Sequence, residues 1–139
     1  VELALRESEQ RFSLVVRASN AGIWDYDALA HTFYFSPRLR ELLGFADDPA
    51  AFDREASFPE WIHPDDREAV LTALRSHVAQ DTRFVLELRI RRRDGSYGWF
   101  LGRAQAIVDA EGRPVRLAGS VSPIDREKAA ESALIEANL

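Results

Sequence analysis

Residues 84–121 read FVLELRIRRRDGSYGWFLGRAQAIVDAEGRPVRLAGSV, and they carry the clearest strand signals of the chain. Apolar and polar side chains alternate from Phe84 to Arg91, which is the period-2 pattern of a half-buried strand. Asp94-Gly95 is a strong signal for a hairpin turn, and residues 109–112 supply a second turn. The stretch therefore predicts three antiparallel strands in a meander, with the later two at 99–108 and 114–121.

Residues upstream of the meander predict a hairpin and several helices. Two short aromatic runs, Ile23 to Tyr26 and Thr32 to Phe35, are typical of a hairpin that joins the same sheet to bury its rings. Ser36-Pro37 is a helix-start signal with Ser36 as the N-cap. Asp65 and Glu68 have the spacing of reciprocal capping before a helix that runs to about residue 80.

The expected fold class is α+β, a five-stranded antiparallel sheet with helices packed on one face and a helix at each end of the chain. We expect three parts: an N-terminal flanking helix at 1–16, a core domain at 17–124 and a C-terminal output or linker helix at 125–139. The first helix carries Leu5, Phe12 and Val16 at near-helical spacing.

Composition limits the possible classes of function. A chain of 139 residues has room for one domain with a single core. Its net charge of -5 argues against nucleic acid, and against contact with an anionic membrane surface. The chain has no cysteine, which excludes disulfides, thiolate nucleophiles and thiolate-ligated metals. Without a long apolar run or a signal-peptide pattern, the chain is expected to be soluble and cytoplasmic.

Catalytic motifs are missing from the sequence. No serine has the context of a nucleophile, and His31, His63 and His77 lie far apart without zinc-ligand spacing. We therefore do not expect an enzyme or a metal site.

Two charged groups have both a functional and an ordinary interpretation. Asp25 and Asp27 could form a carboxylate pair on one strand face, but the solvent side of an edge hairpin is the favoured interpretation. Arginines between residues 89 and 93 could bind an anion, but a solvated sheet face and turn, offset by Glu87 and Asp94, is favoured.

Small side chains on one face of the strand at 99–108 predict unfilled volume above the sheet. Gly102 and Ala104 follow Phe100 on this face, and either a ligand or a large side chain must occupy the space they leave. Close packing favours the second alternative, with the space filled by a side chain such as Phe52, Trp61 or Leu74.

His77 falls on the apolar stripe of its helix, where an unpaired polar ring is costly. Haem ligation or a pH response would explain this position. A partly exposed histidine in the last turn of a helix also caps carbonyl groups, and this interpretation is favoured over haem. The sequence identifies no cofactor.

The order of elements and five short motifs resemble a PAS domain, of the subgroup whose middle helix begins at an I-H-P-x-D-R-x sequence and which closes with a PAC motif. The matching stretches span about Phe12 to Lys128 and comprise residues 33–37 (FYFSP), 41–45 (ELLGF), 61–67 (WIHPDDR), 91–99 (RRRDGSYGW) and 111–119 (EGRPVRLAG).

This resemblance implies a pocket between the sheet and the middle helices, and a role as a sensor or dimerisation module. Such modules belong to larger signalling chains, often a histidine kinase or a cyclic-di-nucleotide enzyme, so a covalently linked output domain is implied. The expected ligand pocket consists of Trp61, Leu74, His77, Leu86, Leu88, Phe100, Gly102 and Ala104.

A small molecule in that pocket would shift the strand that carries Gly119 and Val121, and through Ile124 and Asp125 the exit helix. Here the sequence departs from the family's D-I-T-E-R-like junction. Pro123 replaces the usual Asp and cannot donate a backbone hydrogen bond, while Asp125 replaces the Thr and is expected to cap the exit helix. Without cysteine, a cysteine-linked flavin is excluded.

Three alternatives to ligand sensing stay open. The first is a ligand-free interaction module with a packed core, acting as a homodimer through Leu5, Phe12 and Val16. The two least favoured alternatives are a haem sensor that uses His77 and an enzyme that uses Asp25 and Asp27.

Overall fold

The computed structural model describes residues 1–48, 50–52, 58–79 and 83–139, apart from the side chains of residues 58 and 77–79. Its helices and strands, in chain order, are α1 (Glu2–Ser19), β1 (Gly22–Asp27), β2 (Thr32–Phe35), α2 (Pro37–Leu42), α4 (Phe58–Trp61), α5 (Pro64–Ala79), β3 (Phe84–Arg91), β4 (Tyr97–Val108), β5 (Pro114–Pro123) and α6 (Asp125–Ala137).

The five strands form one antiparallel sheet in the order β2-β1-β5-β4-β3. The last strand in the chain, β5, lies in the middle of the sheet and pairs with both β1 of the predicted hairpin and β4 of the predicted meander. Its Gly119 pairs with Trp24 on β1 and with Ala104 on β4. The predicted α+β class with a five-stranded antiparallel sheet is confirmed.

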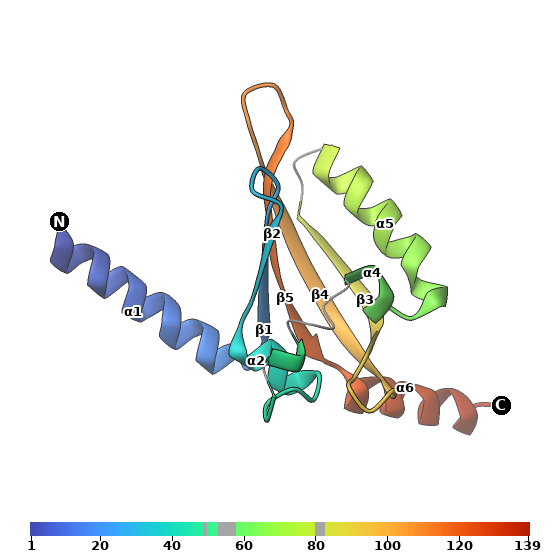
Figure 1. Cartoon of the computed structure of the whole chain (residues 1–139). Helices are drawn as coiled ribbons and strands as arrows, with labels where there is room; N and C mark the ends of the chain where they lie inside the picture. The colour runs from blue at the N-terminus through green and yellow to red at the C-terminus, as the bar shows by residue number, and fades with distance from the viewer. Residues whose placement is uncertain (49, 53–57, 80–82) are drawn as a thin grey trace.

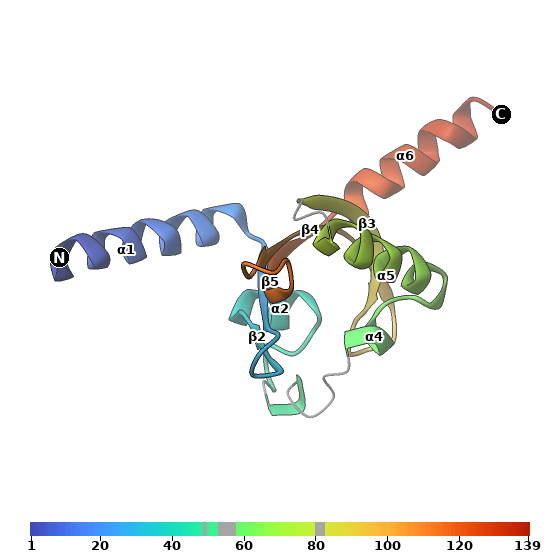
Figure 2. The same cartoon turned by 90° about the horizontal axis from the view of Figure 1, so that it is seen from above.

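Helices α2, α4 and α5 cover the concave face of the curved sheet (Figures 1 and 2). The core between them is rich in aromatic rings, with Phe52, Phe100 and Leu43 the largest fully buried side chains. Phe52 meets Trp61 at 4.8 Å between ring centroids and Phe45 at 5.3 Å. Such ring pairs add to the burial of apolar area that stabilises the fold.

Ser36 caps α2 as predicted and also fixes the helix to the sheet. Its side-chain oxygen accepts the backbone N–H of Leu39 at 3.3 Å and that of Ile23 on β1 at 2.9 Å. Helix α2 ends at Leu42, and Gly44 shortly after it adopts φ +89°, a conformation that costs glycine little.

The start of α5 differs from the predicted capping by Asp65 and Glu68. With Asp65 as the cap, the helix would begin at Asp66. It begins two residues earlier, at Pro64, and the ring nitrogen Nδ1 of His63 accepts the backbone N–H of Asp65 at 3.1 Å. Proline fits the first helical position because its missing N–H would have no partner there.

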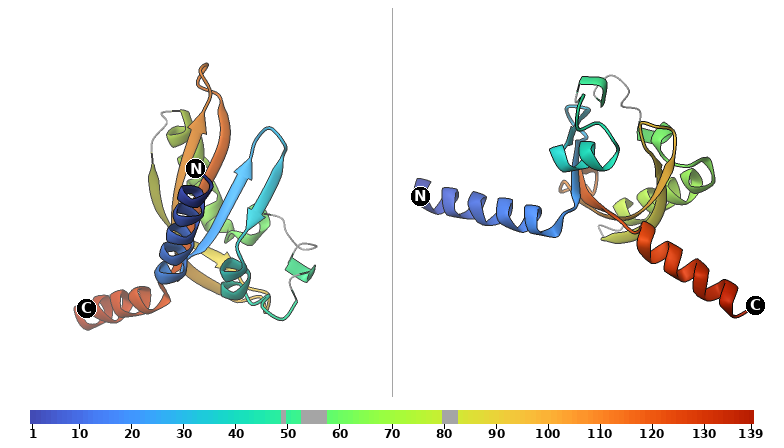
Figure 3. Two further views of the ribbon diagram at one scale, coloured as in Figure 1. Left: turned by 90° about the vertical axis from the view of Figure 1, so that its left-hand side faces the viewer. Right: turned by 90° about the horizontal axis from the view of Figure 1, so that it is seen from below.

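The two terminal helices extend away from the core in different directions, outside the curved sheet (Figures 2 and 3). Neither α1 nor α6 buries a residue. The first helix continues to Ser19 rather than residue 16, and Asn20 ends it in the left-handed conformation. Within the described residues, no helix combines the length and the apolar character that crossing a membrane needs.

Candidate functional site: an apolar cavity and its link to the exit helix

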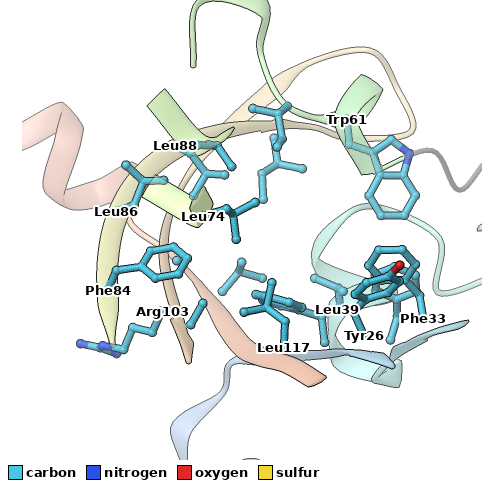
Figure 4. A pocket seen from close by; sticks show the side chains of 18 of the residues that line it. Tyr26, Phe33, Leu39, Trp61, Leu74, Phe84, Leu86, Leu88, Arg103 and Leu117 are labelled. Carbon is cyan, nitrogen blue, oxygen red and sulfur yellow. The ribbon is translucent and has the colours of Figure 1, made fainter. Parts of the chain in front are cut away.

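A cavity of about 260 Å³ lies between the concave face of the sheet and helices α4 and α5 (Figure 4). Its walls come from all five strands and from α2, α4 and α5. The lining residues predicted from the sequence are Trp61, Leu74, Leu86, Leu88, Gly102 and Ala104.

Two small residues on β4 form part of the cavity lining, on the strand face that the sequence pattern indicated. Gly102 and Ala104 lie on the concave face of the sheet, opposite Leu86 and Phe84 on β3. The neighbouring helix side chains Trp61 and Leu74 line the space rather than fill it. The favoured prediction, that such side chains fill the space over Gly102 and Ala104, is therefore not confirmed for Trp61 and Leu74.

Two residues of the predicted pocket have a different status. Phe100 is fully buried and packs in the core instead of lining the cavity. It follows the same face of β4, but nearer the end at which α2 and the segment around Phe52 cover the sheet. His77 belongs to α5, but its side chain lies outside the described part of the structure, so its predicted roles stay predictions.

Aromatic rings from the first hairpin form one wall of the cavity, a contribution the sequence analysis missed. Tyr26 and Phe33 lie 4.5 Å apart between centroids, and Phe35 continues the wall toward Trp61 at 5.6 Å. Figure 4 shows Leu74, Leu86, Leu88 and Phe84 on the opposite side. The alternation in β1 could have found this wall, because it places Trp24 and Tyr26 on a single face.

Charge is absent from the interior of this cavity, among the described side chains that line it. Arg103 is the charged member of the lining, and its guanidinium points away from the centre (Figure 4). The hydroxyl of Tyr26 lies 3.3 Å from Nδ1 of the exposed His31, within hydrogen-bond distance. The backbone of β4 is paired with β3 and β5 on its two sides, so the cavity floor offers few polar groups.

The cavity is connected to the exit helix by the central strand. Val121 lines the cavity and pairs with Gly102, and β5 then continues to Pro123, directly before α6. Two residues before Val121, Gly119 approaches its neighbours so closely that a Cβ atom would collide with the backbone of Arg103 and the ring of Trp24. Gly119, Val121, Ile124 and Asp125 lie on β5 and at the start of α6, and their predicted role in a relay stays a prediction.

Asp125 does not cap the exit helix as predicted. Ile124 occupies the N-cap position, and the Asp125 carboxylate accepts the backbone N–H of Trp99 at 2.9 Å and a guanidinium N–H of Arg92 at 2.8 Å. In addition, the backbone N–H of Ile124 donates to the oxygen of Trp99 at 2.9 Å. The first turn of α6 is therefore bonded to the sheet and not only to itself.

Trp99 links the exit helix to the edge of the sheet. The Nζ atom of Lys128, on α6, lies 4.5 Å from its ring centre, and the Arg89 guanidinium lies 4.9 Å from it. Cations over an indole ring are attracted by its electron-rich face. Glu87 on β3 accepts from Lys128 at 3.2 Å and is the largest cause of the raised pKa of this lysine.

Arg89 in turn binds the helix that covers the cavity. The Asp66 carboxylate, on α5, accepts the backbone N–H of Arg89 at 2.8 Å and two N–H groups of its guanidinium at 2.8 and 3.0 Å. These bonds from Arg89 lower the pKa of Asp66, against the opposing effect of burial. The pair also occupies hydrogen-bonding groups at the open edge of β3, together with His63, whose N–H donates to the oxygen of Arg89.

The arginine run has other partners than predicted. Glu87 and Asp94 were expected to offset it, whereas Arg89 pairs with Asp66, Arg92 with Asp125 and Arg93 with Asp48. These partners are far away in the sequence, so local spacing gave no signal for them.

Asp25 and Asp27 do not form a free carboxylate pair. Arg116 on β5 binds Asp25 through its guanidinium and thereby lowers the pKa of that carboxyl group. Asp27 accepts the backbone N–H groups of Leu29 and Ala30 and so closes the hairpin turn. Both carboxylates have structural partners, which favours the ordinary interpretation of this pair.

The predicted dimerisation residues Leu5 and Phe12 are exposed on α1, while Val16 is half-buried. Further apolar side chains of this helix are exposed with them, namely Leu3, Leu14 and Val15.

An antiparallel sheet in the order β2-β1-β5-β4-β3, with helices enclosing an apolar cavity on one face, defines a sensory type of α+β domain. The chain belongs to the PAS fold family, whose family model matches residues 32–121. The sequence analysis had identified this family correctly.

Relatives of the chain are signalling proteins. It is 31% identical over 126 residues to the sensor protein FixL of Bradyrhizobium diazoefficiens, covering 90% of this chain and 24% of FixL. It is 34% identical over 83 residues to the peroxide stress-activated histidine kinase mak3 of Schizosaccharomyces pombe, covering 60% of this chain and 4% of mak3. The chain thus spans a quarter or less of these two relatives.

Solved structures agree with this assignment. A sensory box histidine kinase/response regulator from Burkholderia thailandensis superposes with a TM-score of 0.78 at 33% identity, covering 92% of this chain and 95% of that one. The N-terminal domain of a diguanylate cyclase with a PAS/PAC sensor from Marinobacter aquaeolei shares the fold, with a TM-score of 0.63 at 23% identity and coverage of 78% and 98%. The chain is accordingly a sensory PAS module.

Proposed function

We propose that this module senses a small molecule in the cavity and relays its presence to α6, and through α6 to an output domain. The output domain of the proposal is a histidine kinase or a cyclic-di-nucleotide enzyme, in line with the relatives. The module itself is non-catalytic and cytoplasmic in this proposal, and neither nucleic acid nor a membrane is among its partners.

One observation carries the proposal: the bonds of Asp125 to Trp99 and Arg92 at the base of α6. Because these bonds join the exit helix to β4, a displacement of β4 or β5 changes the support of α6. Val121 and Gly102 belong to those strands and line the cavity. A ligand that binds one arrangement of the strands better than another would thereby bias the helix.

A second connection supports the relay from the other wall. Helix α5 lines the cavity with Val70, Leu71 and Leu74, and its first turn holds Arg89 through Asp66. Arg89 and Lys128 both lie against the ring of Trp99, so movement of α5 also has a route to α6.

The experiment that tests the relay fills the cavity with a side chain instead of a ligand. Ala104→Leu extends from the sheet into the cavity, and Leu74→Phe extends from α5 and serves if the first variant folds poorly. The control is Ala118→Leu, which places the same extra volume on the opposite face of β5. We expect altered amide hydrogen exchange in α6 for the cavity-filling variants, and unchanged exchange in α6 for both variants contradicts the relay.

A ligand-free dimerisation module is the second candidate, favoured by the exposed apolar side chains of α1. In this function Leu5 and Phe12 would contact a second copy of the chain, and the cavity would have no occupant. The two functions are compatible, since a dimer of sensory modules also brings two exit helices together.

A further inference from the structure

We propose that the ligand of the cavity is an uncharged, apolar molecule about the size of two fused six-membered rings. This inference rests on the proposed function and specifies the chemistry of the molecule that the module senses. It follows from the volume of the cavity, the polarity of its walls and the position of its aromatic rings.

The volume sets the size of the molecule. An apolar protein cavity of about 150 Å³ takes up benzene. The cavity here has about 260 Å³ and therefore accommodates a bicyclic carbon skeleton.

The walls exclude a charged ligand. Burying a carboxylate or an ammonium group without a partner raises the free energy by far more than contact with apolar walls lowers it. Among the described lining side chains, Arg103 is the one with a charge, and it is directed outward (Figure 4). The strand backbone beneath the cavity is already paired on both sides of β4. A ligand inside therefore meets carbon on nearly every side.

The two walls differ in kind and favour a flat molecule. Tyr26, Phe33, Phe35 and Trp61 present rings from one side, and leucine side chains of α5 and β3 close the other together with the ring of Phe84. A planar ring system packs against aromatic rings in offset or edge-to-face contacts and offers its other surface to the leucines.

A way into the cavity exists at its rim. Leu71 on α5 and Phe33 on β2 line the cavity and are also 47% and 46% exposed. A ligand that contacts these two side chains covers part of their exposed surface. Exposed apolar area of this kind is removed from water when the ligand binds.

Naphthalene and 2-naphthoate are the probes that test this inference, since they share a ring system and differ by one charge. Binding is followed by the chemical shifts of the methyl groups of Leu74, Leu86 and Val121, in the wild type, in Ala104→Leu and in the control Ala118→Leu. We expect naphthalene to bind the wild type and the control alike, and Ala104→Leu about tenfold more weakly because the added side chain takes its space. We expect 2-naphthoate to bind about a hundredfold more weakly than naphthalene, since its charge meets no partner among the described side chains of the lining.

Equal or tighter binding of 2-naphthoate, binding of naphthalene that Ala104→Leu does not weaken, or no binding of naphthalene overturns the inference. The proposed relay is judged separately, by the hydrogen exchange of α6 in the cavity-filling variants. If naphthalene does not bind but the cavity-filling variants alter the hydrogen exchange of α6, the ligand class is wrong and the relay stands. If naphthalene binds but the cavity-filling variants leave the hydrogen exchange of α6 unchanged, the relay is wrong and the ligand class stands.

Discussion

The carboxylate of Asp125, the first residue of α6, accepts the backbone N–H of Trp99 in β4 at 2.9 Å. Its other oxygen accepts from Arg92 at 2.8 Å, beside the hairpin between β3 and β4. A side chain at the beginning of a helix usually interacts with the helix's own N–H groups. Here it binds the sheet instead, and this makes the exit helix sensitive to the position of β4.

Replacement of Asp125 by alanine should loosen the base of α6. The carboxylate is 47% exposed, so we discount the bond to about 1 kcal/mol, which corresponds to roughly fivefold faster exchange of the Trp99 amide. Glu127→Ala is the matched control, because it also removes an acidic side chain from the first turn of α6. Equal acceleration in both variants would assign the effect to the helix dipole and not to the bond with Trp99.

Replacement of Asp66 by asparagine should lower the stability at neutral pH by about 1.5–3 kcal/mol, the usual range for hydrogen bonds to a charged group. The folded-state pKa of Asp66 is lowered by its bonds to Arg89, so its contribution is present above the unfolded pKa, about 3.9. That contribution is lost as the pH falls through the folded-state pKa. The difference between wild type and variant should therefore narrow in acid.

Urea unfolding at pH 7 and at successively lower pH values measures this difference in the free energy of unfolding. Asp65→Asn is the control, since Asp65 is the neighbouring residue and its carboxylate is 77% exposed. A difference in the free energy of unfolding between wild type and Asp66→Asn that is independent of pH would show that the charge of Asp66 does not contribute to stability.

Replacement of Gly119 by alanine should destabilise the fold, since the new methyl group collides with the backbone of Arg103 and the ring of Trp24. We expect a loss of about 1–3 kcal/mol, typical of overpacking, in the free energy of unfolding. Ser120→Ala, the next residue on the opposite face of β5, should have little effect. A Gly119→Ala variant as stable as the wild type would mean that β4 and β5 separate easily here.

Replacement of Phe12 by glutamate should dissociate the homodimer that we propose through α1. Phe12 is an exposed aromatic residue on a helix that buries none of its residues, and a charge at an apolar contact opposes association. Sedimentation equilibrium across a range of concentrations measures the change, with Gln10→Glu, on the opposite side of α1, as the control. A wild-type chain that stays monomeric at high concentration contradicts this dimer.

The strands were predictable from the sequence because their signals are local. Alternation from Phe84 to Arg91, the turn at Asp94-Gly95 and the helix start at Ser36 all correspond to observed features. The small residues Gly102 and Ala104 also indicated correctly where the sheet leaves space.

The links between elements were not predictable in this way. Asp66 and Arg89, or Trp99 and Lys128, are joined by the folding of distant segments, and nothing in their own neighbourhoods specifies the partner. Asp125 shows the same limit, because its residue type and position are those of an N-cap while its bonds go to another strand. Phe100 was placed on the correct face of β4, but the sequence did not indicate where along that face the cavity ends.

The most direct test of the relay combines the cavity with the base of the exit helix in one double-mutant cycle. Amide hydrogen exchange along α6 is measured for the wild type, Ala104→Leu, Asp125→Ala and the double variant. If the bond between Asp125 and Trp99 transmits the state of the cavity, Ala104→Leu alters the exchange of α6 in the wild-type background and has no such effect when Asp125 is alanine. The same effect of Ala104→Leu in both backgrounds, or none in either, contradicts the relay through Asp125.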